Sequence, residues 1–188
     1  TAVVIQQGLD VLSGYVYLIC CFFGGLLFFV FVILALICVL FGINFLRLLS
    51  DIKEPILLAF STASSESAMP KTIDALEKHG ISNRIVSFVL PLGYSFNLDG
   101  SIMYMTFATV FIAQSYGIEI TMADQIKMML ILLVTSKGMA GVPRASLVVI
   151  AGMLSMFKIP GEGLLLLLAV DQLLDMGRSA TNVVGNAV

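Results

Sequence analysis

The chain has 188 residues, of which 59% are hydrophobic and only 12% are charged. Soluble domains carry about 25% charged residues, so this composition indicates a protein whose solvent is lipid. The formal net charge is −2 and no basic block is present, which argues against a nucleic-acid partner. The sequence begins without a Met and stops within an apolar stretch, so we expect it to belong to a longer protein.

Residues 15–43 predict a first transmembrane helix, because an apolar run of this length exceeds the roughly 20 residues that a span needs. Residues 51–80 differ, since their apolar segment is short and leads into a serine-rich stretch. The basic residues lie on both sides of it, at Arg47, Lys53, Lys71, Lys78 and Arg84. The positive-inside rule then places both flanks in the cytoplasm and predicts a re-entrant hairpin with a serine-rich tip. A cytoplasmic loop between two spans is the alternative.

A second span is expected over residues 84–116, broken near its middle between Gly93 and Gly100. Asn97 and Asp99 are costly at this depth, and the flanking glycines allow the helix to unwind. Unwound backbone exposes carbonyl oxygens that suit Na⁺, as in many secondary transporters. The alternative is a kink that holds a satisfied polar pair.

Residues 122–158 repeat the hairpin pattern, with short apolar arms around a segment rich in Gly and Pro. Because the preceding span crosses away from the cytoplasm, we expect this second re-entrant hairpin to open from outside and to act as a gate. Residues 161–188 form the last expected span. Its polar face carries Asp171, Asp175, Arg178, Ser179, Asn182 and Asn186, mostly four residues apart. Charges in a span are functional by default, and a structural pair in which Asp171 holds Arg178 is the alternative for part of the face.

The predicted fold is therefore an all-α membrane protein in which a hairpin followed by a span occurs twice, with opposite entry sides. Such inverted repeats are typical of secondary transporters. An enzyme is disfavoured, because the only histidine, His79, lies in a polar stretch that predicts a solvated loop. A channel is disfavoured because a mixed site of Arg, Asp and Asn suits a zwitterionic solute better than a filter of carbonyls.

Four segments, at residues 64–66, 97–101, 136–143 and 175–179, resemble the dicarboxylate/amino acid:cation symporter family, which includes the glutamate transporters. The resemblance runs from about residue 15 to the end of the chain. It implies a multi-pass protein of the plasma or inner membrane that forms a homotrimer, with a static scaffold and a transport domain that moves as an elevator. The chain would then be a partial transport domain, without the N-terminal scaffold and with a truncated last span.

The resemblance also implies a substrate site for an acidic amino acid. Arg178 would bind its side-chain carboxylate and Asp175 its α-ammonium group. The other substrate-binding residues would be Ser64, Ser65, Ser101, Val142, Ser179 and Asn182. The cation-binding residues would be Gly93, Ser95, Asn97, Asp99, Ser136, Lys137, Met139, Asn182 and Asn186. No catalytic residue, cofactor or metal is expected beyond the coupling ions Na⁺ and H⁺.

Three positions depart from the family pattern. Asn186 stands where the Na⁺-coupled members have an Asp, so we expect one Na⁺ site to be weakened and protons to share the coupling. Glu66 is the candidate proton carrier, with a structural hydrogen-bonding role as the alternative. Arg144 follows the gate and either reaches a second carboxylate or faces external water, and Met105 replaces the Glu of the proton-coupled animal members.

The expected function is symport of L-glutamate or L-aspartate with H⁺, Na⁺ or both. Symport of a C4-dicarboxylate is the alternative, and Asp175 opposes it because such a substrate has no ammonium group. Symport of a neutral amino acid or cystine is opposed by Arg178.

Overall fold

The computed structural model of the chain describes residues 9–137 and 143–188, and every regular element within them is a helix. The all-α prediction is therefore confirmed for this part of the chain. The first helix is continuous through α2 (Leu9–Phe28), the π-helical segment η1 (Phe29–Leu34) and α3 (Ala35–Leu40). By length and composition, Ser13–Leu40 and Asn83–Ser115 are each able to cross a membrane.

A short helix, α4 (Phe45–Asp51), leads into the first helical hairpin, α5 (Lys53–Thr62) and α6 (Ser65–His79). The turn between α5 and α6 is tight, because Ala63 adopts the left-handed conformation with φ of 50°. Ser64 then begins α6 as its N-cap, accepting a hydrogen bond from the Ser67 amide at 3.3 Å. The serine-rich segment is thus the tip of the hairpin.

The second expected span is two helices, α7 (Asn83–Phe96) and α8 (Asp99–Ser115). The break covers only Asn97 and Leu98, which is shorter than the segment between the two glycines. Gly93 and Gly100 remain helical, and both allow close packing against α12. A Cβ atom at Gly93 would lie 2.5 Å from Asn186 Oδ1, and one at Gly100 would overlap the Arg178 carbonyl oxygen.

The second hairpin consists of α9 (Met122–Thr135) and α10 (Ala145–Met156). After it come η2 (Gly161–Gly163), α11 (Leu164–Leu167) and α12 (Asp171–Ala187). The last segment is therefore not the single helix expected over residues 161–188, since the chain turns at residues 168–170. This turn places Asp171 in the first turn of α12, where the helix dipole favours a carboxylate.

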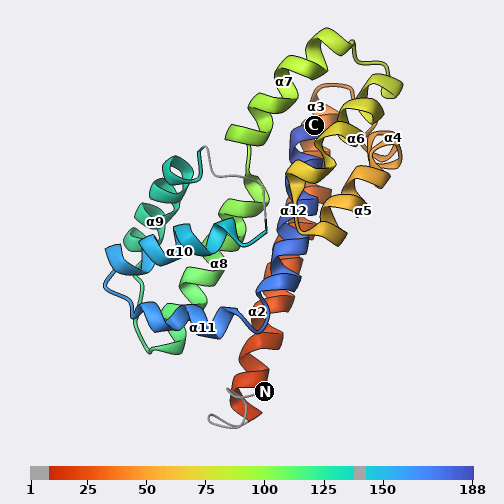
Figure 1. Ribbon diagram of the computed structural model, residues 1–188. Coiled ribbons are helices and arrows are strands. Elements are labelled where there is room, and N and C mark those ends of the chain that lie inside the picture. The colour runs from red at the N-terminus through yellow and green to blue at the C-terminus, as the bar shows by residue number, and fades with distance from the viewer. Residues whose placement is uncertain (1–8, 138–142) are drawn as a thin grey trace.

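The last helix, α12, is the central element and packs against α2, α5, α6, α7 and α8. Figure 1 shows α5 and α6 on one side of α8 and α12, and α9 and α10 on the other. One apolar core joins α2, α8 and α10 through Phe22, Met105 and Ile150. A second core joins α3, α4 and α7 through Cys38, Leu48 and other buried side chains. The first hairpin and the two helices that flank the break thus pack against α12.

Candidate functional site

A buried ion pair on α12 is the centre of the site. Arg178 and Asp175 are three residues apart, and Arg178 Nε contacts Asp175 Oδ1 with both side chains fully shielded from solvent. Arg178 Nη1 also donates to Ser101 Oγ at 3.1 Å, and Nη2 donates to the Ala63 carbonyl at 3.4 Å. The guanidinium group therefore connects α12, the start of α8 and the tip of the first hairpin.

Asn182 completes this polar cluster one turn further along α12. Its Nδ2 donates to Ser101 Oγ at 2.9 Å, and its Oδ1 accepts from the Ser101 amide at 3.3 Å. Ser101 and Asn182 are both fully buried. The predicted substrate residues Ser101, Asp175, Arg178 and Asn182 are thus brought together by hydrogen bonds and one ion pair.

Two further predicted residues present buried hydroxyls without a partner. Within the described ranges, neither Ser65 Oγ at the hairpin tip nor Ser179 Oγ on α12 has a hydrogen-bond partner. Buried polar atoms are nearly always hydrogen-bonded, so such atoms suit a site that is completed by a ligand. Ser64 is also buried and caps α6. Val142, the remaining predicted substrate residue, lies outside the described residues.

Asp171 does not hold Arg178, contrary to the alternative drawn from the sequence. The Tyr104 hydroxyl donates to Asp171 Oδ1 at 2.5 Å, and Arg144 Nε lies 3.5 Å from Asp171 Oδ2. The Arg144 amide donates to Asp175 Oδ2 at 3.0 Å, with Arg144 in the left-handed conformation at φ of 64°. Arg144 therefore contacts both carboxylates of α12, although 62% of its side chain remains exposed.

The predicted cation residues gather around the break between α7 and α8. Asn97 Nδ2 donates to the Gly185 carbonyl at 3.0 Å, and a Cβ atom at Gly185 would lie 2.7 Å from Asp99 Oδ2. The Asn186 amide faces Gly93, and neither of its polar atoms has a hydrogen-bond partner in the described part of the chain. This arrangement brings a carboxylate, two amides and main-chain carbonyls to one place.

Three other predicted cation residues belong to the neighbouring segments. Ser95 Oγ donates to the Pro91 carbonyl at 3.2 Å, within α7. Buried Ser136 is the C-cap of α9, and its hydroxyl donates to the Leu133 carbonyl at 3.4 Å. Lys137 follows, and its Nζ donates to the Phe96 carbonyl. Met139 lies outside the described residues.

Two other residues singled out in the sequence are Glu66 and His79. Glu66 is exposed in the first turn of α6. The prediction that His79 lies in a loop is wrong, because His79 is the last residue of α6. The reason is that α6 continues to Gly80, which ends the helix as its C-cap in the left-handed conformation. The Nδ1 atom of His79 lies 2.5 Å from Asp51 Oδ2.

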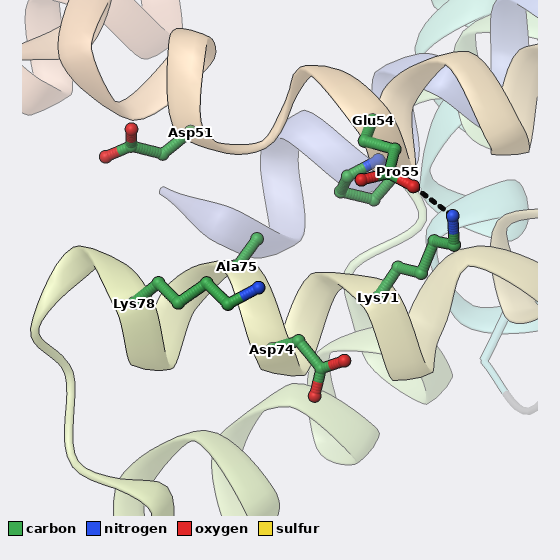
Figure 2. Close-up of a pocket in the computed structure, with 7 residues that line it drawn as sticks. All are labelled: Asp51, Glu54, Pro55, Lys71, Asp74, Ala75 and Lys78. Carbon is green, nitrogen blue, oxygen red and sulfur yellow. Dashed lines mark hydrogen bonds and ion pairs between the residues drawn. The ribbon is translucent and has the colours of Figure 1, made fainter.

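A cavity of about 280 Å³ lies apart from the polar cluster on α12, near the ends of α5 and α6 that are remote from Ala63. Figure 2 shows its lining: Asp51, Glu54, Pro55, Lys71, Asp74, Ala75 and Lys78. Lys71 and Glu54 form an exposed ion pair there, and this contact holds the pKa of Glu54 below its usual range. Because the charges are mixed and solvated, this cavity fits a contact between two helices rather than a substrate site.

Sequence reasoning missed Tyr104 and the Ala63 carbonyl as parts of the site. Tyr104 lies three residues after Ser101 on α8, so helical spacing alone predicts that it shares the face of Ser101. A main-chain carbonyl has no such signal, because any residue type supplies one.

The chain matches the sodium:dicarboxylate symporter family over residues 1–188. It is 48% identical over 166 residues to a proton/sodium-glutamate symport protein of Bacillus caldotenax, covering 88% of this chain and 39% of the relative. It is 48% identical over 164 residues to a proton/glutamate-aspartate symporter of Escherichia coli K12, covering 87% of this chain and 38% of the relative. A C4-dicarboxylate transport protein of Bacillus subtilis is 42% identical over 182 residues, covering 96% of this chain and 43% of the relative.

The chain thus spans about two fifths of the length of these curated relatives. The family match covers the whole chain, and in the described residues two helical segments, Ser13–Leu40 and Asn83–Ser115, are long and apolar enough to cross a membrane. Taken with the polar cluster on α12, these findings place it in a family of membrane transporters: the chain belongs to the sodium:dicarboxylate symporter family.

Proposed function

We propose that this chain forms the substrate-binding part of a symporter of acidic amino acids, L-glutamate or L-aspartate. The observation that carries the proposal is the buried Asp175–Arg178 pair, held between the tip of the first hairpin and the start of α8. A buried guanidinium binds a carboxylate strongly, and a buried carboxylate binds an ammonium group. An acidic amino acid carries both groups. It can replace the Asp175–Arg178 contact with one contact to each of these two side chains.

The buried hydroxyls support the same substrate. Ser101 accepts a hydrogen bond from Arg178, and the buried hydroxyls of Ser65 and Ser179 have no hydrogen-bond partner in the described residues. A second carboxylate of the substrate would accept from such hydroxyls and from the first amides of α6, whose helix dipole favours an anion. Val142 would contribute from the second hairpin.

Asp175 also decides between the two substrate classes named among the relatives. The relatives include glutamate or glutamate-aspartate symporters at 48% identity and a C4-dicarboxylate transport protein at 42% identity. A succinate-like dianion has no ammonium group, so the buried Asp175 carboxylate would repel it. We therefore place acidic amino acids first and C4-dicarboxylates second, while Arg178 disfavours neutral amino acids and cystine.

The transport mechanism is proposed from the arrangement of the helices. The two hairpins, α5–α6 and α9–α10, would be re-entrant from opposite sides, and the whole unit would move as an elevator against a scaffold in a homotrimer. The coupling cations would bind at the helix break through Asn97, Asp99 and Asn186, with carbonyls of Gly93, Ser95, Ser136, Lys137, Met139 and Asn182. Glu66 would serve as a proton carrier.

The test is uptake of labelled L-aspartate by proteoliposomes that hold the complete protein containing this sequence. The wild type is expected to accumulate aspartate under a Na⁺ or pH gradient, with saturation, and to prefer it over succinate. Asp175→Asn is expected to abolish aspartate uptake, whereas Asp124→Asn, on the exposed first turn of α9, is expected to have no effect. Uptake of succinate without aspartate would overturn the assignment of Asp175.

A further inference from the structure

The side chain of Lys137 makes a contact that its assumed role as a carbonyl ligand does not explain. Its Nζ donates to the main-chain carbonyl of Phe96, the last residue of α7. Carbonyls at a helix C-terminus have no intrahelical partner and carry a partial negative charge. Lys137 comes directly after Ser136, the C-cap of α9, so the contact joins the second hairpin to the break between α7 and α8.

The same ammonium acts on the only acid at the break. Asp99 begins α8, and Lys137 is the charged group that attracts its carboxylate. The other side chains near the break, Asn97 and Asn186, are neutral amides. One positive charge thus acts on one negative charge across the break, although the two side chains form no direct ion pair in the described residues.

A coupling cation at a helix break needs main-chain carbonyls and an uncompensated negative charge nearby. Here the Lys137 ammonium already contacts the Phe96 carbonyl, and it also attracts the Asp99 carboxylate. We propose that Lys137 is a built-in cation that takes the place of one free coupling cation at the break. This inference rests on the proposed symport function, and it implies that the protein binds one Na⁺ fewer than it would with a neutral residue at this position.

The proposal is tested by the Na⁺ response of Lys137→Gln against the wild type. Aspartate uptake is measured in proteoliposomes of the complete protein at fixed pH, with Na⁺ titrated against choline. Lys137→Gln is expected to gain a stimulation by Na⁺ of about tenfold or more, which lies within the usual range for coupling between two ligands. Lys137→Arg is expected to keep the wild-type response, because it keeps the charge.

A binding measurement supports the test without requiring transport. In detergent, Na⁺ is expected to raise the melting temperature of Lys137→Gln more than that of the wild type, since a ligand stabilises the state that it binds. Lys127→Gln is the matched control: Lys127 is an exposed lysine on α9 that pairs with Asp124, and its removal should leave the Na⁺ response unchanged.

The outcomes separate the inference from the function on which it rests. An identical Na⁺ response of the wild type and Lys137→Gln, in uptake and in melting temperature, would refute the built-in cation. A wild type that takes up no acidic amino acid under any ion gradient would refute the proposed function instead. If the wild type itself requires Na⁺, the inference still predicts that aspartate uptake by Lys137→Gln depends on a higher power of the Na⁺ concentration.

Discussion

Removing one partner of the buried Asp175–Arg178 pair should destabilise the protein strongly. In Asp175→Asn the Arg178 guanidinium stays buried and keeps neutral acceptors that include Ser101 Oγ at 3.1 Å and the Ala63 carbonyl at 3.4 Å. Breaking a buried ion pair costs about 3–5 kcal/mol. Because two hydrogen bonds remain, we expect the lower end, about 3 kcal/mol of unfolding free energy, measured by denaturant titration in detergent micelles.

The double variant Asp175→Asn/Arg178→Gln tests the reason for this loss. It removes the uncompensated charge, so its unfolding free energy should return close to that of the wild type, while aspartate uptake stays absent. Asp124→Asn serves as the exposed control and should change neither quantity. If the double variant is no more stable than Asp175→Asn alone, buried charge is not the cause, and the electrostatic reasoning fails.

Three more predictions follow from particular contacts. Gly93→Ala should cost about 1–3 kcal/mol of stability through overpacking, because its Cβ would lie 2.5 Å from Asn186 Oδ1; adding Asn186→Ala should relieve the loss in the same denaturant titration. Arg144→Gln should raise the KM for aspartate severalfold and Arg144→Lys should restore it, since the guanidinium lies 3.5 Å from the Asp171 carboxylate of α12; unchanged uptake kinetics would mean that Arg144 only faces water. Lys71→Ala should raise the pKa of Glu54 towards its usual range in an NMR titration, because the Lys71 ammonium holds that pKa down. The sign for stability follows: the contribution of this pair is present above the ordinary Glu pKa and is lost as the pH falls through the lowered value.

The sequence predicted the order of the helices well, because each signal was local. The serine-rich tip, the helix break and the polar face of the last helix each follow from residue types at fixed spacing. The extent of the break was harder to predict. Gly93 and Gly100 look like helix breakers in the sequence, yet both remain helical, and α12 approaches them closely. Only the three-dimensional packing distinguishes a glycine that bends a helix from one that admits a neighbour.

The acidic partner of Arg178 could not be predicted from the sequence either. Asp171, Asp175 and Arg178 share one face, and spacing allows either acid to hold the arginine. The structure pairs Arg178 with Asp175, because Asp171 is held by Tyr104 and Arg144 from two other elements. Contacts between distant segments, such as Lys137 with Phe96, have no local signal at all.

The central position of α12 has a consequence for how the protein assembles. Its packing partners α2, α5, α6, α7 and α8 all precede it in the chain, and the Asp175–Arg178 pair has neighbours only once they are in place. During synthesis the earlier helices must therefore wait, with Ser101 and the first hairpin tip unpaired, until α12 has entered the bilayer. The binding site and the packed fold then form in the same step. An interruption of synthesis before Asp171 should therefore yield an unpacked chain rather than a smaller transporter.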